Sequence, residues 1–85
     1  MYKVRLEVDL AKVCRKFPQK DKEAIFKAIK SLEINPRPNG AITLAGRDGY
    51  RMRVGDYRII YHIKDRELLV LVVDIDGRAD IYKKR

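Results

Sequence analysis

The chain has 85 residues, enough for one modest hydrophobic core, and we expect residues 1–85 to form a single domain. Its 20 lysine and arginine residues outnumber 12 aspartate and glutamate residues, and the net charge of +8 favours a polyanionic partner such as nucleic acid or an acidic protein segment. The sequence has no apolar run of the roughly 20 residues that span a bilayer, and it has no signal-peptide core, so we expect a cytoplasmic protein with no membrane partner. Cys14 is its only cysteine, so we expect no internal disulfide.

The first half of the sequence predicts a β-strand followed by two helices. Apolar and polar side chains alternate over residues 2–8, which is typical of a strand with one buried face. Asp9 can cap a helix over residues 10–17, where apolar side chains recur at helical spacing. Pro18 ends that helix and favours the start of a second one. The second helix has an apolar stripe formed by Ile25, Ala28, Ile29 and Leu32.

Residues 49–61 predict a β-hairpin and are the most informative stretch of the sequence. The pair Gly55-Asp56 lies between two alternating runs and is typical of a two-residue type II′ turn. With that turn, Arg53 lies directly opposite Arg58. Because like charges in this relation destabilise a sheet by roughly 0.2–1 kcal/mol, we expect an anion near the pair. One face of the hairpin is apolar, and the other carries Arg51, Arg53, Arg58 and His62.

The remaining segments complete a small α+β fold. Prolines and glycines in residues 35–46 predict a loop with a short extended piece at residues 41–44. Residues 68–73 are continuously apolar, as expected of a central strand covered on both faces, and residues 74–85 are expected to leave the sheet through Gly77. The element order is β-α-α-β-β-β, which predicts a helical hairpin packed on one face of a mainly antiparallel four-stranded sheet.

A phosphate-binding site is the chemistry that the sequence favours. Guanidinium groups bind phosphate in a bidentate manner and stay charged, so arginines suit the charge that builds up in phosphoryl transfer. Tyr82 can stack on a base, donate a hydrogen bond to phosphate or exchange a proton with it. The alternative is that these residues form the solvated face of a basic protein. If the end of the chain folds back across the sheet, one site could contain Arg51, Arg53, Arg58, Arg78 and Tyr82.

The other polar residues give weaker indications. His62, the only histidine, is either a structural residue at the rim of the site or an accessory acid–base group. One histidine without a second soft ligand does not make a transition-metal site, so we expect no metal and no cofactor. The spacing of Asp74, Asp76 and Asp80 does not fit a calcium loop, and charge partnership with nearby arginines explains them better.

Three motifs resemble the RelE/ParE superfamily, the toxins of prokaryotic type II toxin–antitoxin modules. The longest is L-A-G-R-D-G-Y-R-M-R-V-G-D-Y-R-I-I-Y (Leu44–Tyr61); the others are L-E-I-N-P (Leu32–Pro36) before it and G-R-A-D-I-Y (Gly77–Tyr82) near the end. The resemblance covers essentially the whole chain and is closest to the RelE branch. Many relatives have G-H-R or G-K-R where this chain has D-G-R (Asp76–Arg78), so a basic residue is replaced and an acidic one is gained.

The resemblance implies a RelE-like mRNA interferase, a ribosome-dependent endoribonuclease that cleaves mRNA in the decoding site and so inhibits translation. Matched by motif, Arg58, Arg78 and Tyr82 are the implied catalytic residues, and Arg51 and Arg53 are the implied RNA-phosphate ligands. The implied partners are mRNA, the ribosome and a cognate RelB-like antitoxin that forms a hetero-oligomer with the toxin.

Two other functions remain open on the sequence alone. A ParE-like inhibitor of DNA gyrase would act through protein–protein contacts and would have no nuclease activity. A catalytically degenerate relative would bind RNA with a salt-dependent affinity and would not cut it.

Overall fold

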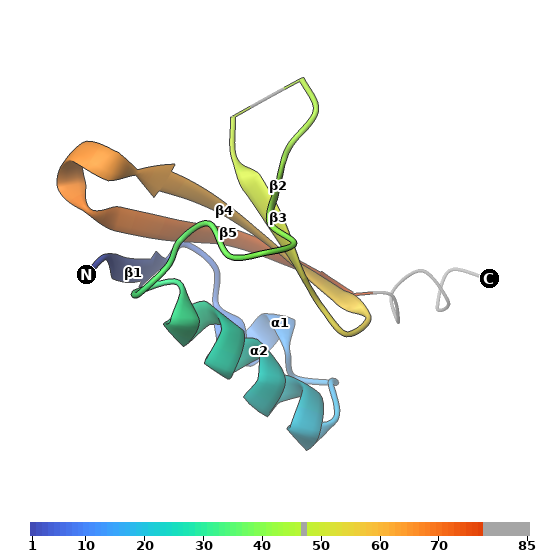
Figure 1. Cartoon of the computed structure of the whole chain (residues 1–85). Helices are drawn as coiled ribbons and strands as arrows, with labels where there is room; N and C mark the ends of the chain where they lie inside the picture. The colour runs from blue at the N-terminus through green and yellow to red at the C-terminus, as the bar shows by residue number, and fades with distance from the viewer. Residues whose placement is uncertain (47, 78–85) are drawn as a thin grey trace.

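The computed structural model describes residues 1–46 and 48–77 and consists of helices packed on one face of a five-stranded sheet (Figure 1). The strand order is β1-β5-β4-β3-β2; β1 runs parallel to β5, and the other neighbours are antiparallel. None of the described helices is long and apolar enough to cross a membrane. In chain order, the elements are β1 (Lys3–Leu6), α1 (Leu10–Val13), α2 (Gln19–Ser31), β2 (Ile42–Thr43), β3 (Tyr50–Val54), β4 (Tyr57–Lys64), the 3₁₀ turn η1 (Asp65–Glu67) and β5 (Leu69–Gly77).

This architecture confirms the predicted α+β fold class, with one strand more than the predicted four. The additional strand is β2, a two-residue strand that follows the proline- and glycine-rich loop. Ile42 pairs with Arg51 and Thr43 with Tyr50, so β2 forms the edge of the sheet beside β3. The extended piece predicted at residues 41–44 therefore belongs to the sheet.

Both helices begin where the sequence predicts, but the first one is shorter. The Asp9 carboxylate accepts a hydrogen bond of 3.2 Å from the backbone N–H of Lys12 and so caps α1. Pro18 occupies the N-cap position of α2. α1 ends at Val13 instead of residue 17, and Cys14 is its C-cap with φ −95° and ψ 7°. Pro18 disfavours the helical conformation at Phe17, the residue before it, and so excludes only the last residue of the predicted helix.

The hydrophobic core lies between the helices and one face of the sheet. Along β4, Tyr57, Ile59 and Tyr61 are buried, whereas Arg58 and Ile60 between them are partly exposed. Side chains alternate between the two faces of a strand, so the arginine belongs to the face that the helices do not cover. The most deeply buried side chains of the core are Tyr61, Ile25, Leu32, Ile59, Val70 and Val72.

Two strands differ from their predictions. Leu6, predicted to be buried, is 42% exposed because β1 is an edge strand of the sheet. β5 continues to Gly77, beyond the end at residue 73 that the apolar run predicts. Val70 and Val72 are buried whereas Leu71 is only partly so, since the helices of the described chain cover one face of the sheet.

A β-bulge in β5 determines which of its residues face the arginines. Ile60 pairs with Asp74, whereas the next residue of β4, Tyr61, pairs with Val72. Val73 is therefore an additional residue in the ladder, and it reverses the alternation of the strand beyond it. As a result, Ile75 points to the core, and Asp76 lies on the open face.

Gly77 is the last residue of β5 and has a packing role there; whether the chain leaves the sheet at this residue lies outside the described residues. A Cβ atom at this position would lie 3.0 Å from Cδ1 of Tyr57 and 3.4 Å from Cζ of Phe17. The two rings pack with their centroids 4.4 Å apart. Only a glycine leaves the space that this aromatic pair fills.

Candidate nucleic-acid interface

The predicted hairpin and its register are confirmed. Arg53 pairs with Arg58, and the ladder continues to Tyr50 opposite Tyr61. Gly55 has a φ of 60°, a conformation that favours glycine, and its neighbour in the turn has no positive φ, as a type II′ turn requires. The hairpin therefore presents its arginines on the face opposite the helices.

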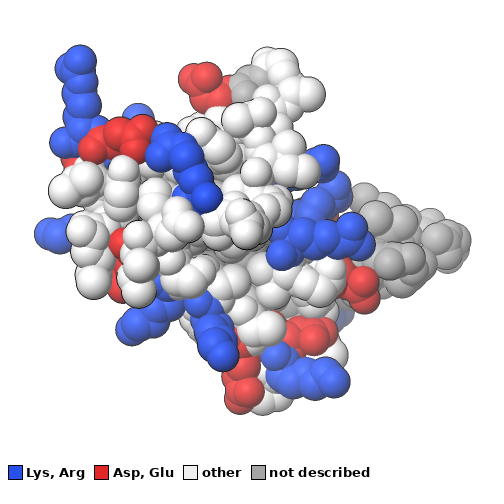
Figure 2. All heavy atoms as spheres, viewed as in Figure 1, with Lys and Arg blue, Asp and Glu red and all other residues white. Residues whose placement is uncertain are grey.

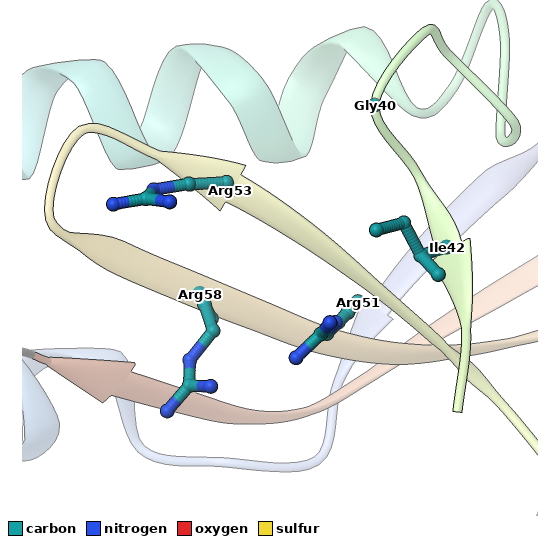
Figure 3. Close-up of a pocket in the computed structure, with 5 residues that line it drawn as sticks. All are labelled: Gly40, Ile42, Arg51, Arg53 and Arg58. Carbon is teal, nitrogen blue, oxygen red and sulfur yellow. The ribbon is translucent and has the colours of Figure 1, made fainter. Parts of the chain in front are cut away.

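Three arginines line one hollow on this open face (Figure 3). Arg51 and Arg53 come from β3 and Arg58 from β4, while Gly40 and Ile42 close one side. The hollow has a volume of about 180 Å³. Guanidinium groups that line an open cavity are suited to an anionic ligand such as a phosphodiester.

An internal carboxylate already approaches this cluster. Asp76 lies opposite Arg58 in the β4–β5 ladder, and its Oδ2 is 2.6 Å from Nη2 of Arg58. The anion expected near Arg53 and Arg58 is therefore supplied in part by the protein itself. The side chains of the ion pair are 42% and 44% exposed, so solvent and ligands can reach both groups.

The other two arginines of the hollow have different surroundings. Nε of Arg53 donates a hydrogen bond of 3.2 Å to the carbonyl oxygen of Gly55, which turns the side chain along the hairpin turn. The side chain of Arg51 makes no hydrogen bond or ion pair with the residues that the structure describes. The charge-partner interpretation is confirmed for Asp76, whereas Oδ1 of Asp74 accepts a hydrogen bond from the backbone N–H of Ile75.

His62 lies apart from the arginine hollow. It is half-buried and is not among the residues that line the cavity. A Cβ atom on Gly49 would lie 3.1 Å from its Cδ2 and Nε2 atoms, so the imidazole packs closely against the backbone before β3. This contact favours the structural interpretation of His62, and an accessory acid–base role remains a prediction.

Arg78, Tyr82 and Asp80 lie outside the described residues. The described chain ends at Gly77, directly after the aspartate that contacts Arg58. Convergence of Arg78 and Tyr82 on the hollow remains a prediction from the sequence.

Charges of both signs are interspersed on the face shown in Figure 2. Basic side chains are spread around it with acidic ones between them, and one basic group lies over the β3–β4 hairpin. The net positive charge does not make this face uniformly basic. Recognition of a polyanion would therefore depend on local groups such as the arginine hollow.

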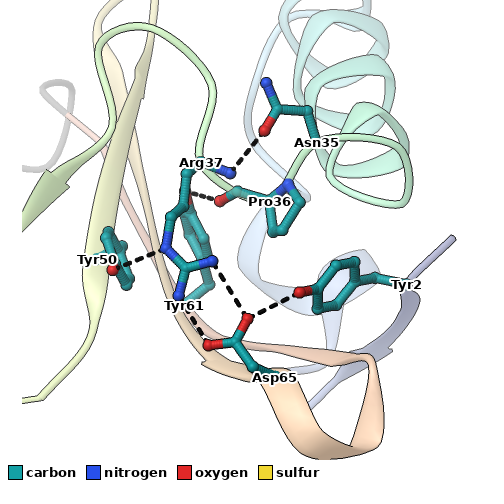
Figure 4. A network of polar contacts seen from close by, with 7 residues as sticks. All are labelled: Tyr2, Asn35, Pro36, Arg37, Tyr50, Tyr61 and Asp65. Carbon is teal, nitrogen blue, oxygen red and sulfur yellow. Dashed lines mark hydrogen bonds and ion pairs between the residues drawn. The ribbon is translucent and has the colours of Figure 1, made fainter.

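A polar network that the sequence did not indicate holds the loop beside the hollow (Figure 4). Arg37 binds Asp65 in a bidentate manner, with N–O distances of 3.2 and 2.9 Å, and its Nε donates to the Tyr50 hydroxyl at 3.0 Å. The hydroxyl of Tyr2 donates to the same aspartate at 2.7 Å. The network ties the segment after α2 to β1, β3 and η1, and this segment leads directly to Gly40 at the edge of the hollow.

The network also shifts the pKa values of its members. Hydrogen bonds from Arg37 and then from Tyr2 lower the pKa of Asp65. The same aspartate raises the pKa of the Tyr2 phenol, because a carboxylate acceptor favours the protonated hydroxyl. The only hint of this network in the sequence is that Arg37 lies between two prolines, which restrict the path of the chain.

A second hollow, of about 230 Å³, lies between the edge strand β1 and helix α2. It is mostly apolar, and Leu6 and Phe26 in its lining are 42% and 56% exposed. Lys30 and Glu33 are the charged residues of its lining. Exposed apolar side chains that share a groove are typical of a surface that binds a protein partner.

Comparisons with known proteins agree with this fold. The model of the family described as "ParE toxin of type II toxin-antitoxin system, parDE" matches residues 2–82. The structure is similar to a chain of the archaeal RelE–RelB complex from Pyrococcus horikoshii OT3, with 24% identity, 91% of this chain and 94% of the other covered, and a TM-score of 0.76. It is also similar to a chain of the RelBE2 toxin–antitoxin complex from Mycobacterium tuberculosis, with 25% identity, coverage of 91% and 98%, and a TM-score of 0.75.

The isolated RelE toxin of E. coli has the same fold, with 22% identity, coverage of 99% and 94%, and a TM-score of 0.73. A search of curated proteins gave no match. Since the family match spans nearly the whole sequence, the chain belongs to the ParE toxin family of type II toxin–antitoxin systems and so to the RelE/ParE superfamily.

Proposed function

We propose that this toxin is an endoribonuclease that cleaves ribosome-bound mRNA and thereby inhibits translation. The observation that carries the proposal is that Arg51, Arg53 and Arg58 line one open hollow. A protein that acted only through apolar protein–protein contacts would not need a cluster of guanidinium groups on the uncovered face of its sheet.

The proposed chemistry is transesterification without a metal ion. The 2′-oxygen of a ribose attacks the adjacent phosphorus, the bond to the 5′-oxygen of the next nucleotide breaks, and the products are a 2′,3′-cyclic phosphate and a 5′-hydroxyl. Arg58 and Arg78 would hold the scissile phosphate and stabilise its additional negative charge. Arg51 and Arg53 would bind flanking phosphates, and Tyr82 would stack on a base or transfer a proton.

Positioning must supply much of the rate in this scheme. The arginines of the hollow stay protonated at neutral pH and are therefore poor general bases. Correct alignment of reacting groups can contribute about 7–11 kcal/mol to lowering a barrier. A ribosome that holds the mRNA in a fixed conformation would provide that alignment, which is the reason for proposing a ribosome-bound substrate.

A second candidate function follows from the family itself. The family that matches this chain is described as a ParE toxin family. A ParE-like toxin that inhibits DNA gyrase requires no nuclease site. That function predicts DNA breaks and an SOS response while mRNA stays intact. A degenerate relative that binds RNA without cleavage is a third outcome, and the Arg58–Asp76 ion pair is the observation that favours it.

One experiment separates these functions. The toxin is induced briefly in a bacterial host, the 5′ ends of all transcripts are mapped, and an SOS reporter is followed in parallel. New 5′-hydroxyl ends within coding regions, without an SOS response, would support the nuclease. The variants Arg58→Ala and Arg78→Ala should lose these ends, whereas Arg66→Ala, which removes a charge at the far end of β4, should keep them. Full cleavage by a folded Arg58→Ala or Arg78→Ala protein would refute the site.

We also propose that a RelB-like antitoxin binds the apolar groove between β1 and α2. Several of the similar solved structures are complexes of a toxin with its antitoxin. The net charge of +8 favours an acidic partner, and Lys30 at the groove can pair with a carboxylate of an amphipathic segment. Phe26→Ser should weaken the complex with the antitoxin encoded beside the toxin.

The matched control for this groove is Ile34→Ser. Ile34 is 78% exposed and does not line the groove, so its substitution removes a similar apolar surface elsewhere. Equal affinities of the antitoxin for both variants, measured by calorimetry, would show that the groove is not its binding surface.

A further inference from the structure

We propose that Asp76 is a built-in competitor that occupies the phosphate site at Arg58 and limits the affinity of the toxin for RNA. This inference rests on the proposed function, because it assumes that the arginine hollow receives an RNA phosphate. Its physical basis is the position of one carboxylate within a row of charged residues that crosses three neighbouring strands.

The row runs across β5, β4 and β3. Asp76 lies opposite Arg58, and Arg58 lies opposite Arg53. In an antiparallel sheet, directly opposite side chains on one face are neighbours, so Arg58 is between a like charge and an opposite charge. Its guanidinium takes the opposite one, with Nη2 at 2.6 Å from Oδ2 of Asp76.

A carboxylate and a phosphate present the same kind of oxygen acceptors to a guanidinium group. The Arg58 donor that contacts Asp76 is therefore unavailable to a phosphate until the ion pair opens. Both side chains are more than two-fifths exposed, so the pair is a weak, surface-type interaction that a ligand can displace. Asp76 therefore reduces the affinity of the hollow without blocking it.

The bulge at Val73 creates this arrangement. Without the additional residue, β5 would set Ile75 opposite Arg58 and would turn Asp76 toward the core. Bulges of this type redirect side chains next to functional sites. The carboxylate of Asp76 thus reaches Arg58 because of the bulge at Val73.

The test measures binding separately from cleavage. Full-length wild-type toxin and the variant Asp76→Asn are titrated with a single-stranded RNA oligonucleotide whose ribose 2′-oxygens are methylated, so that it cannot be cleaved. Asparagine keeps the size of the side chain and removes its charge. We expect Asp76→Asn to bind the oligonucleotide about threefold more tightly, in the range that an exposed ion pair allows.

Two control variants remove a negative charge elsewhere. Asp74→Asn removes a negative charge on the same strand, two residues away from Asp76. Glu67→Gln removes one in η1, at the far end of the β4–β5 hairpin. Neither should tighten binding as much as Asp76→Asn does. Equal gains in all three variants would show a general effect of net charge and would overturn the proposal.

A double-mutant cycle identifies the arginine that is released. In the background of Arg58→Ala, the gain from Asp76→Asn should disappear. Weaker binding by Asp76→Asn alone would show that Asp76 orients Arg58 for its ligand, which contradicts competition. Tighter binding by Asp76→Asn without any cleavage of unmodified mRNA would support Asp76 as a competitor and refute the nuclease activity. Cleavage of mRNA together with an unchanged affinity in Asp76→Asn would support the nuclease activity and refute the competitor.

Discussion

The hydroxyl of Tyr57 on β4 donates a hydrogen bond of 2.8 Å to Oδ2 of Asp21 on α2. This bond connects the helical layer to the strand that carries Arg58, the next residue in the chain. Tyr57 is 6% exposed, so its ring lies in the core while its hydroxyl reaches the helix. From the covered face of the sheet, helix α2 thereby helps to fix the part of the hairpin that presents arginines to solvent on the other face.

Tyr57→Phe should lower the free energy of unfolding by about 1.5 kcal/mol, because a charge-assisted hydrogen bond is lost and the partner carboxylate stays partly buried. Urea denaturation measures the change. The matched control is Tyr2→Phe, which removes a phenol–carboxylate hydrogen bond in an exposed position and should cost less. Equal losses in the two variants would contradict the importance of burial at Tyr57.

Alkaline pH should destabilise the fold through two buried tyrosines. Burial, followed by the hydrogen bond to Asp21, raises the pKa of Tyr57 to about 12, and burial raises the pKa of Tyr61 to about 12, from an ordinary value of 10.0. The native state keeps protons that the unfolded chain releases. Stability from these groups is complete below pH 10 and is lost as the pH rises through about 12.

Urea denaturation at a series of pH values, together with tyrosinate absorbance, measures this alkaline effect. Tyr57→Phe should show a shallower loss of stability over the same range, because one of the two raised pKa values is removed. A loss of equal steepness in the variant and the wild type would show that Tyr57 does not contribute.

Gly77→Ala should destabilise the protein by about 1–3 kcal/mol through overpacking. The added methyl group would meet the Tyr57 ring at 3.0 Å and the Phe17 ring at 3.4 Å. A second substitution, Phe17→Ala, makes room for the tyrosine ring to move, so the double variant should be more stable than the sum of the two single effects predicts. If the effects of the two substitutions on thermal denaturation were strictly additive, close packing against the two rings would not be the reason for a glycine at this position.

The hairpin could be predicted from the sequence because its information is local. Gly55 determines the turn, the turn determines the register, and a period of two then places Arg53 opposite Arg58. The same reasoning failed in β5, where residues 69–73 are continuously apolar and contain no periodicity to show a bulge. The sequence therefore indicated an arginine partner for Asp76 but could not show that this partner is Arg58.

Two other features depend on relations that a single sequence does not contain. Leu6 has the pattern of a buried position, but burial requires a neighbour on both sides of the strand, and β1 is at the edge of the sheet. Arg37 and Asp65 are 28 residues apart, and no local pattern links them. Strand order and long-range polar pairing thus limit what could be predicted.

Arg37→Ala should weaken the fold and the edge of the arginine hollow together, because it removes the anchor of the segment that leads to Gly40. In the native state, Arg37 lowers the pKa of Asp65. A depressed carboxylate pKa stabilises the fold above its ordinary value of 3.8, and this contribution is lost as the pH falls through the native pKa.

Denaturation at neutral pH and at about pH 3 tests the network. The wild type should lose more stability between the two conditions than Arg37→Ala does, since the variant lacks the ion pair that acid breaks. Asp65→Asn should resemble Arg37→Ala in this respect. An identical acid sensitivity of all three proteins would show that the network does not contribute to stability.

The affinity for single-stranded RNA should depend on salt through the arginines of the hollow. Each phosphate contact contributes a slope of about −0.7 to the plot of log K against log salt concentration. Arg51 makes no internal ion pair among the described residues, so Arg51→Ala should reduce the slope by about one such contact. Arg66→Ala removes the same charge from η1, at the opposite end of β4, and should leave the slope nearly unchanged.

The measurement is fluorescence anisotropy with a 2′-O-methylated oligonucleotide. Equal slopes for Arg51→Ala and wild type, with a clear loss in Arg66→Ala, would place the RNA elsewhere on the molecule.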